Sequence, residues 1–326
     1  MARFLARRFL SAFLLLFIVL SLAFFLSRLL PGGPITRSHE TSRLTPAQIE
    51  TLKEAYGLDR PLIEQYLSWL RRILLHWDWG PSFTYRQPAA QVLAQALPNT
   101  VILGVTALLL QYFLGTLLGL LTAWRAGGAL DSSLRITSLI LFSVPSFWLG
   151  IMAIYLFHGR LRLLPAGGMA SPGAARLPLS ERWLDLLQHL VLPATLLGVL
   201  GAAAIAQFLR NSLLDVLQQD FIRTARALGI PERRLLWRHA LRNALVPLIQ
   251  LLGLSFPALL NGVLVTEVVF GWPGVGQVLF SACISRDYGL ILAATAYGAL
   301  MVILGSLLSD LLHRAADPRV QLLEHT

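Results

Sequence analysis

The sequence contains one cysteine and one lysine among its 326 residues, and each scarcity excludes a kind of site. Cys283 alone can form neither an internal disulfide nor a cysteine metal cluster. Lys53 stands in Thr-Leu-Lys-Glu with no glycine-rich loop before it, so the chain has no P-loop for a nucleotide. If ATP drives the work of this protein, another chain must bind it.

Hydrolase motifs are also missing. Gly253-Leu-Ser-Phe-Pro257 fails as a nucleophile elbow at its last position, and no His-Glu-x-x-His zinc helix occurs. The seven histidines are scattered singly, as loop or interfacial residues usually are. Ser255 and His239 are a nucleophile and a base by residue type only, so an intramembrane enzyme is the remote alternative.

Charge is scarce, at 13% of residues, whereas 56% are hydrophobic and the mean hydropathy is +0.65. A soluble domain cannot bury that much apolar surface, so the composition predicts an integral membrane protein. The net charge of +10 is then explained by arginines that flank the spans on the cytoplasmic side, rather than by binding of nucleic acid.

Six long runs without Asp, Glu, Lys or Arg are present. A helix needs about 20 apolar residues to cross the hydrocarbon layer, and the alternation of a barrel strand is absent from these runs. The second run is longer, and Pro98-Asn99 is taken as the start of its helix. The sequence therefore predicts six transmembrane helices, within residues 9–27, 87–124, 136–159, 186–209, 243–266 and 288–309.

The distribution of arginines predicts the orientation. With the N-terminus inside, the inner segments hold 14 arginines and the two short outer loops hold 5. Both termini and the segment 210–242 are therefore expected in the cytoplasm. The first run has no small-residue cleavage site after it, so we interpret it as a retained helix rather than a signal peptide.

The long outer segment 31–97 is expected to be helical. Thr45-Pro-Ala-Gln48 fits a capping box, and Gly57 fits the end of that helix. A second helix is indicated by apolar residues at helical spacing. This segment fits equally a packed cap on the outer mouth and a docking surface for a soluble protein. The apolar residues of the second helix are Leu62, Ile63, Tyr66, Leu67, Leu70, Ile73 and Leu74.

The cytoplasmic segment contains a short helix, a glycine and a second helix start. Asp220 suits the beginning of a helix that runs to about Leu228, and Gly229 permits the left-handed conformation that ends it. Pro231 and Glu232 suit the first turn of the next helix. A basic membrane flank explains the arginines but not this helix break, which favours a surface for a soluble partner.

Polar residues inside the predicted spans are candidates for a substrate pathway, because they are expensive in a membrane. Glu267 also fits an acid in the outer interface, next to a glycine- and proline-rich loop that is a candidate outer gate. Gly115 and Gly119 indicate close helix packing rather than substrate contact. The candidate pathway residues are Asn99, Gln111, Gln207, Asn261 and Glu267, with Gln250 also within a span.

The segment 220–247 resembles the coupling loop of ABC-importer permeases, most closely the first-permease type of the dipeptide/oligopeptide/nickel subfamily. Phe221-Ile-Arg-Thr-Ala-Arg-Ala-Leu-Gly229 and Arg238-His-Ala-Leu-Arg-Asn-Ala244 match that subfamily's variant, although Arg223-Thr224 depart from the generic Glu-Ala. Gly33 replaces the usual acid after the first span. Further matches in order along the chain are Gly57-Leu-Asp-Arg-Pro61, Leu97-Pro-Asn-Thr100, Leu192-Pro-Ala-Thr195, Phe270-Gly-Trp-Pro-Gly274 and Asp317-Pro-Arg319.

The resemblance implies an all-α membrane protein of the bacterial inner membrane, with residues 1–97 as the first helix plus outer segment and 98–326 as a five-helix permease core. It implies import of di- or oligopeptides, with nickel chelate or another small solute as the alternative. Implied partners are a second homologous permease, two ATP-binding subunits that hold ATP and Mg, and a periplasmic or lipid-anchored solute-binding protein; this chain itself holds no cofactor. The residues implied in ATPase coupling are Asp220, Arg223, Thr224, Ala225, Arg226, Gly229, Glu232 and Arg233.

Overall fold

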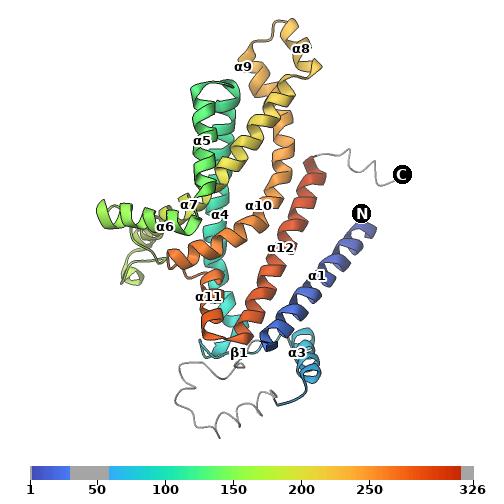
Figure 1. The fold of residues 1–326 in the computed structure, drawn as a ribbon, viewed down its shortest axis with the longest axis vertical. Coiled ribbons are helices and arrows are strands. Elements are labelled where there is room, and N and C mark those ends of the chain that lie inside the picture. Colours follow the sequence, from blue (N-terminus) through green and yellow to red (C-terminus); the bar gives the residue numbers. More distant parts are fainter. Residues whose placement is uncertain (1, 30–58, 317–326) are drawn as a thin grey trace. The chain divides into compact units, whose positions relative to one another are not determined.

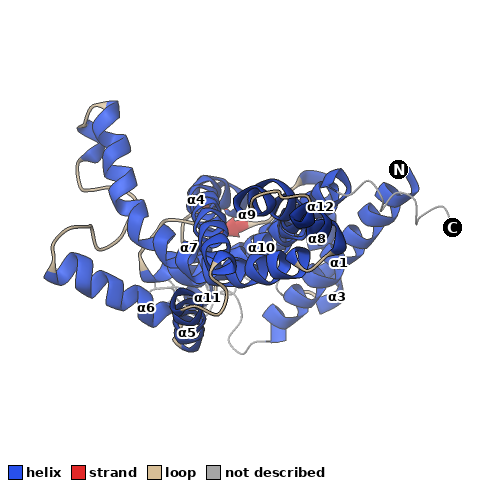
Figure 2. Cartoon of the chain, turned by 90° about the horizontal axis from the view of Figure 1, so that it is seen from above, coloured by secondary structure: helices blue, strands red, loops and turns tan. Residues whose placement is uncertain are grey.

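The structure is a computed structural model that describes residues 2–29 and 59–316 (Figure 1). The chain divides into two compact units. The first unit comprises residues 1–100 and 273–303, and the second comprises residues 101–272 and 304–326. Helices dominate the described residues, as expected, and the strands contribute only one short hairpin (Figure 2).

The first unit contains the N-terminal helix, the end of the outer segment and the short helix α11 that precedes the last helix. The hairpin pairs Ser82 with Gln87 in antiparallel register. Helices α4 and α12 continue from this unit into the second. Its elements are α1 (Ala2–Leu29), α3 (Leu62–His76), β1 (Pro81–Ser82), β2 (Gln87–Pro88), the start of α4 (Ala89–Trp124), α11 (Val275–Ser285) and the start of α12 (Tyr288–Ala316).

Aromatic side chains hold α3 against α1. The ring of Phe24 is fully buried, 5.0 Å from Trp69 and 5.4 Å from Tyr66 between centroids, and the Ser21 and Tyr66 hydroxyls lie 2.7 Å apart. Offset and tilted aromatic pairs of this kind stabilise a core beyond the area they bury. The predicted helix over residues 62–74 is therefore confirmed, while the capping box at 45–48 and its end at Gly57 lie outside the described residues.

The buried carboxylate of Asp287 anchors the hairpin to the turn between α11 and α12. It accepts hydrogen bonds from the Ser82 hydroxyl at 2.6 Å and from the Thr84 amide at 3.0 Å. It also accepts one from the amide of Leu290 at 3.3 Å, in the first turn of α12. One acid thus satisfies donors from two segments that are about 200 residues apart in sequence.

The second unit is built around α7, whose small residues let α4 approach closely. A β-carbon added to Gly115 would lie 2.6 Å from Cβ of Ile205, and one added to Gly119 would lie 2.9 Å from the carbonyl oxygen of Ala206. The predicted packing role of these glycines is confirmed. The helices of this unit are the rest of α4, α5 (Ala129–Ser143), α6 (Ser146–Ala153), a π-helix (Ile154–Arg160), a 3-10 turn (Ala174–Arg176), α7 (Leu179–Leu217), α8 (Asp220–Ala227), α9 (Glu232–Arg234), a π-helix (Leu235–Ala240) and α10 (Leu241–Val269).

Among the described residues of both units, four helices are long and apolar enough to cross a membrane. A fifth candidate is the bent pair of α5 and α6, with the π-helix that continues α6. The helix α10 covers the predicted fifth span over 29 residues. The full six-span topology stays a prediction. The four helices are Leu10–Leu29, Ala89–Trp124, Leu179–Leu217 and Tyr288–Leu308.

Two predicted spans differ from the structure in their local geometry. The second helix begins at Ala89, not at Pro98, which lies inside α4. The third predicted span is broken at Val144-Pro145, where the two halves meet at 100°. Proline forces the residue before it out of the helical region, and Val144 is accordingly extended, with φ −95° and ψ 131°.

Candidate functional site

The predicted cytoplasmic helix is present as α8, and it lies with α9 at the far end of α7 and α10 (Figure 1). Its N-cap is Gln219, which is extended, so Asp220 is the first helical residue rather than the cap. The Asp220 carboxylate still suits the positive end of the helix dipole. The Thr224 hydroxyl donates to the Asp220 carbonyl oxygen at 2.9 Å, within the same short helix.

A Schellman motif ends α8. Gly229 has φ +77°, and its amide donates to the carbonyl oxygen of Arg226 at 3.0 Å, while the Ile230 amide donates to that of Ala225 at 3.2 Å. A β-carbon added to Gly229 would meet nothing within 4 Å. Glycine is required here for its backbone conformation, as predicted, and not for lack of space.

An ion pair closes the turn between α8 and α9. The Arg226 guanidinium donates two hydrogen bonds to the Glu232 carboxylate, Nε to Oε1 at 2.5 Å and Nη2 to Oε2 at 3.1 Å. The hydrogen bonds from Arg226 hold the pKa of Glu232 below its ordinary value, and Glu232 raises the pKa of Arg226. Both side chains are about half exposed, so the pair fixes geometry more than it adds stability. Arg223 makes a weaker, exposed contact with Asp220 at 3.4 Å.

The inner face of α8 belongs to the core of the second unit. Ile222 and Ala225 are buried in a cluster with Leu213 of α7, Leu235 of the following π-helix and Ala244 of α10. Ala225 therefore faces the chain's own core, and the coupling role that the resemblance implied for it stays a prediction. This cluster packs α8 against both α7 and α10.

The outer face of α8 carries two large apolar side chains that the sequence reasoning did not single out. Phe221 is 42% exposed and Leu228 is 77% exposed, one at each end of the helix. Arg223 and Thr224 lie exposed between them, and Arg233 is exposed on α9. A short, mostly polar helix gives little sign of an apolar outer face. The available signal was that the segment contains two more large apolar residues, Phe221 and Leu228, than Ile222 and Ala225, which pack into the core.

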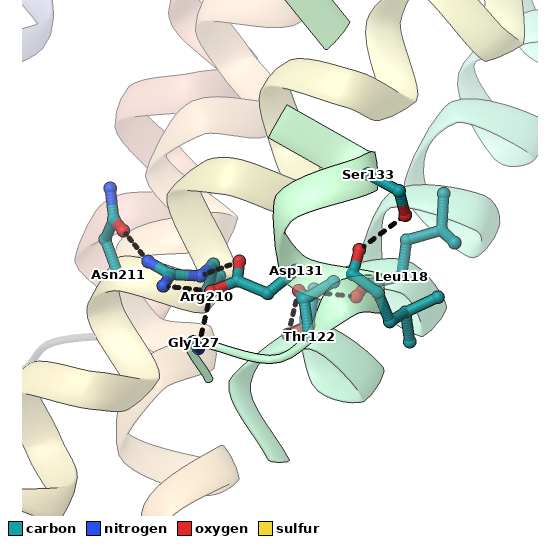
Figure 3. A network of polar contacts seen from close by, with 9 residues as sticks. Leu118, Thr122, Gly127, Asp131, Ser133, Arg210 and Asn211 are labelled. Atoms are coloured by element: carbon teal, nitrogen blue, oxygen red, sulfur yellow. Dashed lines mark hydrogen bonds and ion pairs between the residues drawn. The ribbon is translucent and has the colours of Figure 1, made fainter. Parts of the chain in front are cut away.

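A buried ion pair, also missed, supports the base of this end of the second unit (Figure 3). Asp131 at the start of α5 is fully buried and accepts two hydrogen bonds from Arg210 of α7, both at 2.6 Å. The Gly127 amide donates to the same carboxylate at 2.9 Å, and Asn211 accepts from Arg210 at 3.0 Å. A bidentate pair with one further backbone donor ties the α4–α5 turn to α7 in one geometry.

The predicted pathway residues are found in different environments. Asn99, in the first unit, donates to the carbonyl oxygen of Pro273 at 2.8 Å. Gln111 is buried against Gly201, and Gln207 is half-buried on α7.

Glu267 is fully buried near the end of α10, and its carbonyl oxygen accepts from the Trp272 amide at 2.9 Å. The side chains of Asn261 and Gln250 lie outside those the structure describes. A pathway lined by the five candidate residues stays a prediction.

Comparison with known proteins relates the chain to membrane transport components. Residues 115–322 match the family "Binding-protein-dependent transport system inner membrane component", and residues 1–104 match the N-terminal family of the same components. The oligopeptide transport system permease protein AppB of Bacillus subtilis is 34% identical over 98% of this chain and 100% of its own. The di/tripeptide transport system permease protein DppB of Pseudomonas aeruginosa is 35% identical over 98% and 99%.

A solved structure supports the fold. A chain from inward-facing conformations of the MetNI methionine ABC transporter aligns with a TM-score of 0.54 and 17% identity, over 70% of this chain and 97% of that one. At this identity the match bears on the fold alone. The two family matches, and not this structure, show the family of the chain.

Proposed function

The chain belongs to the family of inner membrane components of binding-protein-dependent transport systems, and we propose that it is a permease subunit for ATP-driven import of di- and oligopeptides. Its relatives along the whole chain are named as oligopeptide and di/tripeptide permeases, which favours peptides over nickel chelates. The single observation that carries the coupling part of the proposal is the exposed apolar face of α8, held on a capped and ion-paired turn.

The proposed topology has six spans. They are α1, α4, the bent α5–α6 pair, α7, α10 and α12, with both termini in the cytoplasm. The arginine distribution supports this orientation, because basic residues remain on the inner side of short loops. The α8–α9 tip then lies in the cytoplasm, and α3 with the β1–β2 hairpin lies outside.

The proposed assembly contains a second permease, two ATP-binding subunits that hold ATP and Mg, and a solute-binding protein on the outer side. This chain has no P-loop, so the nucleotide belongs to the partners. One coupling tip from each permease would engage one ATP-binding subunit. Closure of the two ATP-binding subunits would then switch the spans between inward-open and outward-open arrangements.

The contacts of α8 suggest how force would pass through the tip. Phe221 and Leu228 are the apolar anchors for a groove on the partner, in the manner of helix-in-groove recognition. Ile222 and Ala225 lock the helix to the core between α7 and α10, so a push on α8 is passed to both long helices. The Arg226–Glu232 pair keeps α8 and α9 in one orientation during that push.

The test uses the complete set of subunits in proteoliposomes and measures ATP-dependent uptake of a labelled tripeptide. We expect Phe221→Asp with Leu228→Asp to lower uptake at least tenfold, because interface anchors of this kind carry about 1–2 kcal/mol each. The matched control is Leu163→Asp, at a side chain that is 68% exposed in the loop after the π-helix. Uptake at the wild-type rate in the double variant would remove the coupling role. Transport of a nickel chelate but no peptide would overturn only the substrate.

A further inference from the structure

One stripe of α1 is apolar along most of its length and ends in an arginine. Phe13, Phe17, Leu20, Phe24 and Arg28 follow one another at intervals of three or four residues, so they share a face of the helix. The lower part of this stripe borders a groove of about 360 Å³ within the first unit. Its lining is apolar throughout and comes from α1, α3, the turn after α3 and α12: Phe13, Leu14, Leu16, Phe17, Leu20, Trp69, Leu70, Ile73, Leu74, Trp77, Trp79 and Leu300.

Three buried polar atoms near the arginine end of the stripe are left without a partner. Among the described residues, Arg28 Nε, Trp69 Nε1 and Tyr288 Oη make no hydrogen bond. Trp69 and Tyr288 are only 5% and 4% exposed, so water does not readily satisfy them. Buried donors are nearly always paired in a native protein, and three together indicate that an acceptor is missing.

The charge at this end of the stripe is also uncompensated. Arg28 lies over the ring of Phe24 at 5.3 Å, and it interacts electrostatically with both Tyr288 and Arg72. Arg71 and Arg72 are exposed on α3, and in the part of the chain that the structure describes none of the three arginines pairs with an acid. Like charges held close together favour an anion between them.

We propose that this groove binds one anionic phospholipid, with an acyl chain along the part of the α1 stripe from Phe13 to Leu20 and the headgroup phosphate at Arg28. An acyl chain fits an apolar groove on a protein whose family resides in the inner membrane. The phosphate supplies an acceptor for the partly exposed Arg28, and a guanidinium suits a phosphate in fork geometry. This site needs only residence in the membrane and is independent of the transported solute.

The experiment measures the lipids retained by the purified complex after incorporation into nanodiscs with equal phosphatidylglycerol and phosphatidylethanolamine. Native mass spectrometry should find one phosphatidylglycerol per complex held by the wild type beyond the bulk ratio. Arg28→Gln and Arg72→Gln should each lower this retention about fivefold, the factor expected for one arginine at an anionic lipid surface. Arg125→Gln, at an exposed arginine of the second unit, is the matched control and should leave retention unchanged.

A second variant separates the acyl chain from the headgroup. Leu74→Trp should fill part of the groove from an exposed lining position and lower retention without touching the arginines. Equal retention of the two lipids, or wild-type retention in both Arg28→Gln and Leu74→Trp, would overturn the proposal. Cross-linking of Arg28→Lys to Glu50 or Glu54 would also overturn it, since the missing acceptor would then belong to this chain. The proposal would fail as well if inorganic phosphate bound to the complex without displacing the retained phosphatidylglycerol.

Discussion

Replacement of Gly229 tests whether the α8–α9 turn depends on backbone conformation. Gly229 has φ +77°, and an added β-carbon meets nothing within 4 Å, so Gly229→Ala introduces strain without a clash. The left-handed conformation costs about 1–2 kcal/mol for a residue with a β-carbon. That energy corresponds to a factor of roughly 5–30 in the population of the closed turn. Gly229→Asn should cost less, because asparagine tolerates this conformation better.

The readout is hydrogen exchange at the Ile230 amide, which donates to the Ala225 carbonyl oxygen at 3.2 Å across the turn. Exchange in the assembled complex should accelerate about 5- to 30-fold in Gly229→Ala and less in Gly229→Asn. Gly173→Ala is the matched control, since Gly173 has φ +86° and equally open surroundings but lies far along the chain from α8. Wild-type protection of Ile230 in Gly229→Ala would refute the reasoning, as would equal acceleration in Gly173→Ala.

Three further predictions concern packing, the buried ion pair and pH. Gly115→Val should reduce the thermal stability of the purified chain, because its β-carbon would lie 2.6 Å from a side chain of α7, whereas Gly298→Val on α12, with nothing within 4 Å, should not. Asp131→Asn should destabilise the chain by about 3 kcal/mol in chemical denaturation, because it leaves the Arg210 charge buried and unpaired. Adding Arg210→Met to this variant should recover most of the lost stability, since the unpaired charge is then gone. If the destabilisation of the double variant equalled the sum of the two single variants, a direct pair would be contradicted. The lowered pKa of Glu232 means that its contribution to the turn is present above the unfolded pKa of about 4.3 and is lost as pH falls through the folded value. Wild-type uptake should therefore exceed that of Glu232→Gln at neutral pH, and the difference should shrink as pH falls below about 4.3 and Glu232 becomes protonated; a difference that grows as pH falls would contradict the role of the pair.

Local chemistry made the α8–α9 turn predictable. Gly229 followed by Pro231 leaves the backbone few options, so the end of α8 and the start of α9 were both found where the sequence indicated. The long apolar runs predicted helices because a backbone in lipid must satisfy its own hydrogen bonds. The packing of Gly115 and Gly119 followed from residue size alone.

Features that depend on a partner distant in sequence were not predictable. Asp131 and Arg210 are 79 residues apart, and each looks like an ordinary charge at the edge of an apolar run. The bend at Pro145 was hidden because the run around it is apolar on both sides. The two faces of α8 were also not separable from its sequence: Phe221 and Leu228 are exposed, whereas Ile222 and Ala225 are buried in the core.

The most direct test of the account is a cross-link from the outer face of α8. In a Cys283→Ser background the chain has no other cysteine, so Leu228→Cys carries one benzophenone label at a side-chain position that is 77% exposed. Illumination of the assembled complex should join this position to an ATP-binding subunit, with a yield that changes when ATP is added. The same label at Leu163→Cys should not reach that subunit. A cross-link to the ATP-binding subunit from Leu163→Cys but not from Leu228→Cys would contradict the coupling role of α8.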